Sequence, residues 1–281
     1  MEWTECFNCA VSYIEEHLTE KIDPVQLARI AGCSSYYFQK TFLYVAGLSV
    51  SEYIRRRRMT LAAAELRTTQ KKIVDIALKY GYDSPTAFNR AFQSVQGVPP
   101  SAVRQNNAAL KVYPVLTFHF SLSGADGTAF KIEKKPSFQI SGVSFPLDKK
   151  LENNFAAIPG QWDKALADGT LSRLCALMEG EPRGLLGVSV HHTEDWRYYI
   201  AVSSSHTPSD FETYHIPQAD WAVFSGSGTN RTLQELERHV ILNWLPASGY
   251  GCAALPDVEV YLKADPENAV FEYWLPVVKK C

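Results

Sequence analysis

The 281-residue sequence has no apolar run that approaches the roughly 20 residues needed to cross a membrane, and no basic and then apolar signal pattern at its N-terminus. Its six cysteines are scattered, which is not the spacing of a disulfide framework. Cys6 and Cys9 form a lone CxxC pair, which we interpret as neighbours on a buried helical face. No nucleophile elbow, Walker loop or HExxH motif is present. We therefore expect a cytoplasmic protein without enzyme activity, cofactor or metal site.

Charge and tryptophan are unevenly distributed along the chain. Residues 1–108 contain 13 Lys or Arg and 10 Asp or Glu, whereas residues 109–281 contain 15 and 20. Only Trp3 lies in the first part, and the other five tryptophans lie in the second. The length is comfortable for two domains. We therefore expect a weakly basic N-terminal domain and an acidic, aromatic-rich C-terminal domain.

The N-terminal part contains an internal repeat. The Leu-Ala and Gly at positions 27, 28 and 32 are matched 49 residues later by Ile-Ala and Gly, and six positions between 34 and 47 recur 50 residues later. In each copy a short helix ends at a glycine and a serine opens a second helix, which is the helix-turn-helix pattern. Residues 52–66 supply a helix between the copies. The pattern predicts an all-α domain with two tandem helix-turn-helix units.

Several segments of this domain resemble the AraC/XylS family of transcription regulators. The resemblance is carried by residues 76–82 (IALKYGY), Ser84, Phe88, Arg90, Phe92, residues 97–101 (GVPPS), residues 53–59 (YIRRRRM) and Ala62. It covers about residues 5–106 and implies a DNA-binding domain, for which we expect the boundaries 1–108. Pro85 departs from the family pattern: it removes a backbone N–H at the start of the second recognition helix and argues against a phosphate contact there.

Recognition helices present their first turns to base edges in the major groove. We expect Phe38, Phe42, Phe88 and Phe92 to face inward, so that their neighbours face DNA. The candidate DNA-binding residues are therefore Ser35, Tyr36, Gln39 and Lys40 in the first unit and Ser84, Thr86, Ala87, Asn89 and Arg90 in the second. The resemblance implies base reading at all of these positions except Ser35, Ser84 and Asn89. The alternative is that these residues form the solvated face of an ordinary helical bundle.

Residues 55–58 are four consecutive arginines. On one helix they point in four directions, so they do not form a single patch. We expect one or two of them to pack or form ion pairs within the domain and the others to contact phosphates. Because the net charge of the domain is low for DNA binding, its positive charge has to be concentrated on one face.

Residues 109–127 are expected to form a linker, in which the alternating stretch 111–122 predicts one additional strand. The pattern that follows is a strand pair, a helix interrupted at Gly169, and a hairpin. A strand, a helix and a hairpin then recur, with the second set at 221–225, 233–245, 258–262 and 270–278. This order predicts an α+β domain over residues 128–281, built as a duplicated βαββ unit with an antiparallel sheet.

The same segments resemble a GyrI-like effector-binding domain. The matching pieces include residues 130–133 (FKIE), 216–224 (IPQADWAVF), 259–261 (EVY) and 271–277 (FEYWLPV). The resemblance spans about residues 128–279. It implies a pocket between the two halves that binds small, often lipophilic or cationic, molecules around a buried carboxylate.

The acid that we match to this carboxylate is Glu272, with Glu259 as a second candidate. A carboxylate surrounded by aromatic rings suits a cation, through its charge and the ring quadrupoles. The other candidate ligand-binding residues are Trp274, Trp162, Tyr198, Trp221, Phe224, Trp244 and Tyr261. The alternatives are that Glu272 is a solvent-exposed residue of a half-buried strand and that the aromatic residues form an ordinary core.

Together these features predict a one-component transcription regulator. The expected partners are double-stranded DNA, a small-molecule effector and RNA polymerase, with no membrane. Two helix-turn-helix units can occupy successive major grooves about 34 Å apart, so that a single chain can bind an asymmetric site. The alternatives are a small-molecule hydrolase with Glu272 as its general base, and a protein-binding or drug-sequestering module. Turnover of a bound ligand distinguishes the hydrolase from the sensor.

Overall fold

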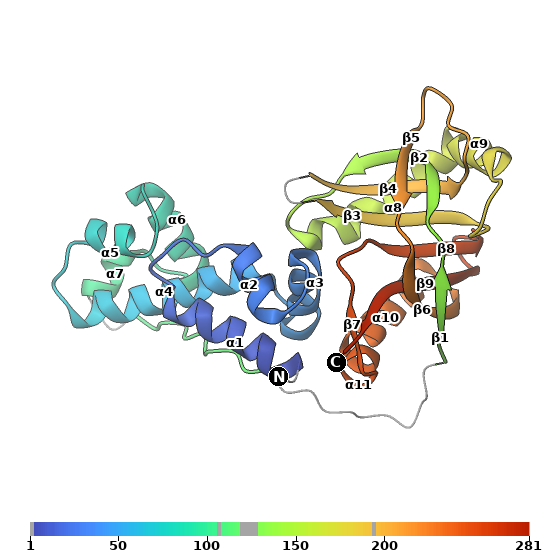
Figure 1. The fold of residues 1–281 in the computed structure, drawn as a ribbon. Helices are drawn as coiled ribbons and strands as arrows, with labels where there is room; N and C mark the ends of the chain where they lie inside the picture. The colour runs from blue at the N-terminus through green and yellow to red at the C-terminus, as the bar shows by residue number, and fades with distance from the viewer. Residues whose placement is uncertain (1–2, 106–107, 119–128, 193–194, 281) are drawn as a thin grey trace. The chain divides into compact units, whose positions relative to one another are not determined.

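The computed structural model describes residues 3–105, 108–118, 129–192 and 195–280. The chain divides into two compact units, Met1–His119 and Phe120–Cys281. We call them the helical body and the sheet body (Figure 1). Within the described residues no helix is long and apolar enough to span a membrane.

The helical body contains seven helices among the residues described. They are α1 (Trp3–Glu16), α2 (Pro24–Ala31), α3 (Ser35–Ala46), α4 (Val50–Thr68), α5 (Ile73–Lys79), α6 (Pro85–Gln96) and α7 (Pro100–Gln105). The pairs α2–α3 and α5–α6 are the two helix-turn-helix motifs, and α4 packs against helices of both (Figure 1). The predicted fold of this domain is confirmed.

The two recognition helices, α3 and α6, begin and end in the same way. At the start of each, the side-chain oxygen of a serine, Ser34 or Ser84, accepts a hydrogen bond from the backbone N–H three residues further on. At the end of each, a glycine adopts the left-handed conformation that side chains disfavour, with φ of 68° at Gly47 and 80° at Gly97. These residues explain why both helices have the same length.

Phenylalanines form the core of both motifs. Phe38, Phe42, Phe88 and Phe92 are fully buried, as the repeat predicted. The expectation for the two cysteines of α1 was wrong: Cys9 is exposed and Cys6 is only half-buried. The buried face of α1 is formed instead by residues such as Phe7, whose ring lies 5.2 Å from that of Phe38.

Residues 108–118 run along the helical body without forming a strand. The strand predicted within residues 111–122 is therefore wrong for its described part, and residues 119–122 lie outside the described residues. The physical reason is that helix side chains, rather than a neighbouring strand, take up the backbone hydrogen bonds of this segment.

Among its described residues, the sheet body contains nine strands, with helices placed between them in the chain. The strands are β1 (Lys131–Lys135), β2 (Phe138–Pro146), β3 (Leu185–His192), β4 (Asp195–Ser203), β5 (Glu212–Ile216), β6 (Ala219–Gly228), β7 (Tyr250–Cys252), β8 (Asp257–Lys263) and β9 (Ala269–Lys279). The helices are α8 (Leu151–Ala167), α9 (Thr170–Leu177), α10 (Asn230–His239), the π-helical turn η1 (Val240–Trp244) and α11 (Leu245–Ala247).

The sheet is a duplicated βαββ unit, as predicted. Its strand order is β1-β6-β9-β8-β3-β4-β2-β5, with β7 added beside β9. One half contains β2, β3 and β4 and the other contains β6, β8 and β9, and the halves meet where β3 and β8 pair in antiparallel fashion. The outer strands are exchanged: β1 precedes β2 in the chain but pairs with β6, and β5 precedes β6 but pairs with β2.

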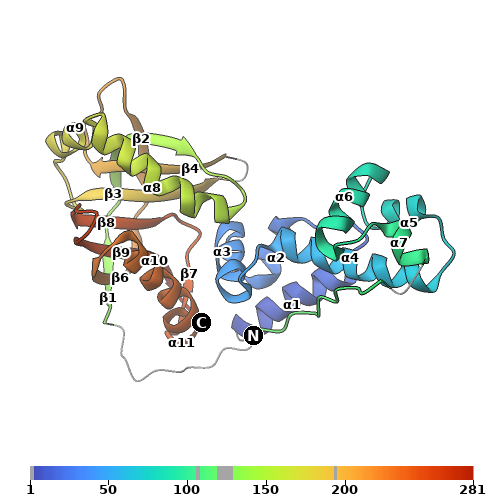
Figure 2. The same ribbon diagram turned by 180° about the vertical axis from the view of Figure 1, so that it is seen from behind.

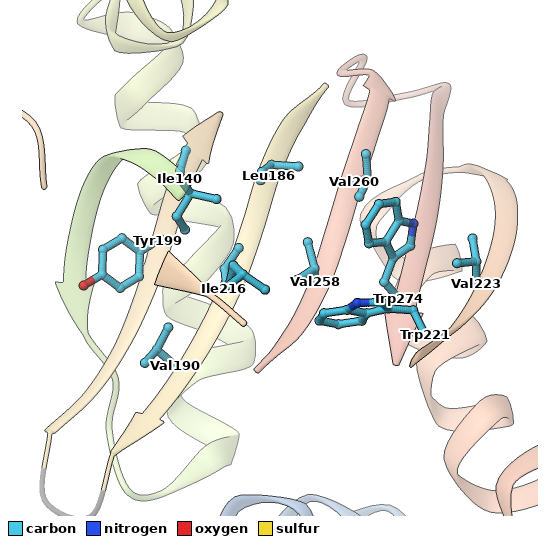
Figure 3. Close-up of a cluster of buried hydrophobic side chains, with 12 residues drawn as sticks. Ile140, Leu186, Val190, Tyr199, Ile216, Trp221, Val223, Val258, Val260 and Trp274 are labelled. Carbon is cyan, nitrogen blue, oxygen red and sulfur yellow. The ribbon is translucent and has the colours of Figure 1, made fainter. Parts of the chain in front are cut away.

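The exchange forces the sheet to curl. Only residues 217 and 218 separate β5 from β6, although these strands lie towards opposite ends of the strand order. The inner face of the curl is filled by a cluster of strand side chains that includes Trp221, Trp274, Val258 and Val260 (Figure 3). The opposite face is covered by helices, and in the view of Figure 2 α8 and α10 lie in front of the strands. The sheet body therefore has two distinct apolar layers.

Candidate effector site and DNA-binding surface

Glu259 on β8 lies at the centre of a polar and aromatic cluster on the helix-covered face. Its Oε2 accepts hydrogen bonds from the hydroxyl of Tyr198 at 2.8 Å and from that of Tyr261 at 3.0 Å. Trp162 of α8 donates its indole N–H to the Tyr198 oxygen at 3.1 Å. Glu259 keeps part of its surface exposed although it lies deep among protein atoms.

Burial raises the pKa of Glu259 to about 8, and the negative charges of Glu237 and Asp257 act in the same direction. The two tyrosine hydrogen bonds act in the opposite direction, without cancelling the effect of burial. Burial also raises the pKa values of Tyr198 and Tyr261, so both hydroxyls keep their protons and act as donors. Burial therefore favours the protonated form of the Glu259 carboxyl group.

A glycine makes room for this cluster. Gly187 of β3 lies directly opposite Glu259 in the sheet. A Cβ atom at this position would lie 2.1 Å from the Tyr198 hydroxyl and 2.5 Å from Glu259 Oε2. Any side chain here would therefore disrupt the hydrogen bond between them.

A cavity of about 230 Å³ adjoins the cluster. Trp162 and Tyr261 line it, and their rings meet edge to face with centroids 4.9 Å apart. The other lining residues are mainly apolar and include Pro159, Leu166, Leu171 and Ala269, with two acids, Asp163 and Asp265. Tyr261 thus contacts the cavity and holds the Glu259 carboxyl group at the same time. The arrangement fits a lipophilic molecule that places a positive charge near the aromatic rings.

The structure places Glu272, the acid matched from the sequence, away from this cluster. On β9 this residue pairs with Val260, which places it on the face opposite Glu259, and its Oε2 accepts a hydrogen bond from the Trp274 indole at 2.8 Å. Trp274 and Trp221 belong to the strand cluster on that face, with ring centroids 5.9 Å apart. Because the sheet lies between them and the cavity, these three residues do not share a site with Glu259.

The remaining candidate ligand-binding residues divide into two groups. Trp162, Tyr198 and Tyr261 meet at Glu259. Phe224 and Trp244 pack against each other in the second half, with ring centroids 4.9 Å apart, and they do not line the cavity. The sequence signal for the site was an acid within an apolar strand, since Val258 and Val260 on either side of Glu259 are buried.

The predicted DNA-contacting residues of the second motif form an exposed surface on α6. Thr86, Ala87, Asn89 and Arg90 are all exposed. Ser84 is also exposed, and its hydroxyl oxygen caps the helix. This surface is available for contact with base edges.

The candidate residues of the first motif lie on α3. Ser35, Tyr36 and Gln39 are partly exposed, and the Gln39 amide donates to the Ser35 hydroxyl at 3.3 Å. Lys40, at the position that matches Arg90, places its Nζ 5.4 Å from the centre of the Tyr36 ring. Contact of these residues with DNA stays a prediction.

All four arginines of α4 have partners within the helical body. Arg55 and Arg56 each form an ion pair with Glu52 at 2.6 Å. The guanidinium of Arg57 pairs with Glu15 at 2.7 Å, and that of Arg58 donates to the Leu18 carbonyl at 2.8 Å. The sequence predicted this for only one or two of them. All four arginines are thus held within the domain, and contact of the more exposed Arg55 and Arg56 with phosphates stays a prediction.

Comparisons with known proteins match both bodies. Residues 131–277 match the family described as "Integron-associated effector binding protein", and residues 27–106 match a helix-turn-helix domain. The regulatory protein SoxS of Escherichia coli (strain K12) is 38% identical over 94 residues, which are 34% of this chain and 88% of SoxS. The transcriptional regulator Rob of Salmonella typhimurium is 36% identical over 95 residues, which are 34% of this chain and 33% of Rob. The structure of SAV2435 bound to tetraphenylphosphonium is 17% identical, with a TM-score of 0.45 over 53% of this chain and 94% of that chain.

Two tandem helix-turn-helix motifs followed by a duplicated βαββ sheet define a transcription regulator with an effector-binding domain. The chain belongs to the AraC family of transcription regulators, and its second body belongs to the integron-associated effector binding proteins, whose family model covers more than half of the chain. The relatives named above are regulators rather than enzymes.

Proposed function

We propose that this chain binds a specific DNA site through α3 and α6, and that a lipophilic cation in the cavity beside Glu259 changes this binding. The observation that carries the effector part is a carboxyl group held by two tyrosines, one of which, Tyr261, lines a mainly apolar cavity together with Trp162. Residues 1–108 are the proposed DNA-binding domain and residues 128–281 the proposed effector-binding domain.

A cation suits this site because a nearby positive charge lowers the pKa of Glu259, which burial raises. Without a ligand, burial favours the protonated carboxyl group. A positive charge nearby favours the carboxylate, and the faces of Trp162 and Tyr261 attract it further. The apolar wall takes up the lipophilic part of the ligand. A neutral ligand of the same shape gains only the contact of its lipophilic part with the apolar wall.

The effector part is tested with tetraphenylphosphonium, a lipophilic monovalent cation, by calorimetric titration of the full chain. We expect Glu259→Gln to weaken binding at least tenfold, which is about 1.4 kcal/mol. Glu272→Gln is the matched control, because it makes the same change on the opposite face of the sheet. Triphenylphosphine oxide, a neutral analogue, should bind the parent chain and the Glu259 variant alike. An unchanged dissociation constant in Glu259→Gln would remove this acid from the site.

The DNA-binding part is tested at Arg90, which is exposed on α6. A duplex selected for tight binding to the full chain is compared with random duplex at one salt concentration. We expect Arg90→Ala to weaken binding to the selected duplex by about 1–3 kcal/mol, the usual contribution of a good base contact. Arg183→Ala removes the same charge from the sheet body and is the matched control. Equal affinity of the parent chain for both duplexes contradicts specific recognition.

Regulation requires that the two binding events be linked. A ligand shifts DNA affinity only if it binds the DNA-bound and free states differently, and DNA then shifts ligand affinity by the same factor.

We propose a sensor rather than an enzyme, so the ligand should be recovered unchanged after incubation. Contact with RNA polymerase is a further part of the proposal, and transcription with purified polymerase is its test.

A further inference from the structure

A segment outside both family models ties the two helix-turn-helix motifs together. We call residues 108–118 the strap. Near one end, the Gln96 amide of α6 accepts a hydrogen bond from the Lys111 N–H at 2.8 Å and donates one to the Lys111 carbonyl at 3.0 Å. At the other end, the Asn8 amide of α1 makes the same pair of bonds with Phe118, at 2.8 and 3.0 Å. Each side-chain amide thus forms the pair of backbone hydrogen bonds that a neighbouring β-strand would otherwise form.

Between Asn8 and Gln96, side chains of α4 form hydrogen bonds with the backbone of the strap. The Thr60 hydroxyl accepts a hydrogen bond from the Tyr113 N–H at 3.2 Å, and the Arg57 guanidinium donates one to the Tyr113 carbonyl at 2.5 Å. The Tyr53 hydroxyl accepts one from the Leu116 N–H at 3.3 Å. The strap is therefore bonded to the helices along most of its length.

Strap side chains are also inserted into both motifs. Leu110 and Tyr113 pack against the core of the second motif. Phe118 is buried against the first, with its ring centroid 6.0 Å from that of Phe7 and 5.4 Å from that of Phe42. The strap therefore reaches from the second motif to the first, along the helix that joins them.

We propose that the strap is a second brace between the motifs, beside α4, and that it sets the spacing at which α3 and α6 meet DNA. Asn8 and Gln96 are its positioning residues. Two recognition helices bind one duplex well only if their spacing matches that of the grooves, so a rigid pair distinguishes between DNA spacings and a loose pair does not. The inference rests on the proposed DNA binding.

The test compares three duplexes that carry the two recognised DNA segments: at native spacing, with two base pairs inserted between the segments, and with one segment replaced by random sequence. The full chain should bind the inserted duplex at least tenfold more weakly than the native one. Gln96→Ala should reduce that ratio several-fold and leave affinity for the single-segment duplex unchanged. Gln70→Ala, at an exposed glutamine, is the matched control.

Asn8→Ala releases the opposite end of the strap and should reduce the ratio in the same way. It keeps the test valid if the Gln96 variant does not fold, which thermal melting shows directly. A full parental ratio in a folded variant overturns the brace. A parent chain that binds the two-segment duplex no better than random DNA instead overturns the proposed DNA binding, and the brace with it.

Discussion

Glu259 and Glu272 lie on neighbouring strands, and their position along each strand decides which of them lies on the same face of the sheet as the cavity. Glu259 lies opposite Tyr273 and Glu272 lies opposite Val260, so the two acids point to opposite faces of the sheet. Each acid is followed two residues later by an aromatic residue, Tyr261 or Trp274, so the local sequence pattern does not distinguish the two acids. The separation depends on which face α8 and α10 cover, and this is set by long-range packing. Three of the aromatic candidates named from the sequence, Trp162, Tyr198 and Tyr261, therefore lie together at Glu259, whereas Glu272 lies on the other face.

The titration of Glu259 predicts how ligand binding depends on pH. With a pKa of about 8, the group must lose its proton before it can pair with a cation. Affinity for tetraphenylphosphonium should therefore rise with pH below about 8, by up to roughly tenfold per pH unit, and level off above it. Calorimetric titrations between pH 6 and pH 9 measure this. In Glu259→Gln the affinity should be almost independent of pH, and a parental slope in that variant contradicts the assignment.

Helix ends were predictable because single residues determine them. The serine caps and glycine ends of α3 and α6 are local features, and so is the break between α8 and α9 at Gly169. The start of α8 was not predictable: the helix begins at Leu151 and continues through Pro159, where local rules favour a helix start. The short strands β5 and β7 were missed as well, because their partners β2 and β9 are distant in the chain.

The junction of α4 with α5 predicts a response to acid. Glu65 forms ion pairs with Lys71 at 2.7 Å and Lys79 at 2.8 Å, and these bonds lower its pKa to about 2. The lowered pKa of Glu65 stabilises the fold at pH values above 4.5, which is the ordinary pKa of a glutamate. This contribution is lost as the pH falls from 4.5 towards 2. Both lysines are substantially exposed, so we expect Glu65→Gln to lower the free energy of unfolding by only about 1 kcal/mol at pH 7.

Urea unfolding followed by circular dichroism, at pH 7 and at pH 2.5, measures the effect of Glu65→Gln. The difference from the parent chain should shrink at the lower pH. Glu16→Gln, at an exposed position of α1, is the control and should change stability little at either pH. A difference that persists unchanged at pH 2.5 would contradict the ionic origin of the effect.

At the scale of the whole molecule, the order of the elements along the chain could be predicted from the sequence, whereas the pairing of the strands could not. The two helix-turn-helix copies and the two βαββ copies were both visible as repeated patterns. The exchange of β1 and β5 between the sheet halves was not visible, because a two-residue connection normally joins neighbouring strands of a hairpin. In this chain the same short connection links strands near opposite ends of a curled sheet.

The exchanged strands make each half of the sheet dependent on the other. A single repeat, cut out with its leading strand, would have no partner for that strand and would leave the outer edge of its second strand uncovered. Two identical copies would satisfy both needs by trading leading strands, which is the geometry of a domain-swapped dimer. The sheet body thus has the form of such a dimer joined into one chain, and its two repeats are obliged to fold together.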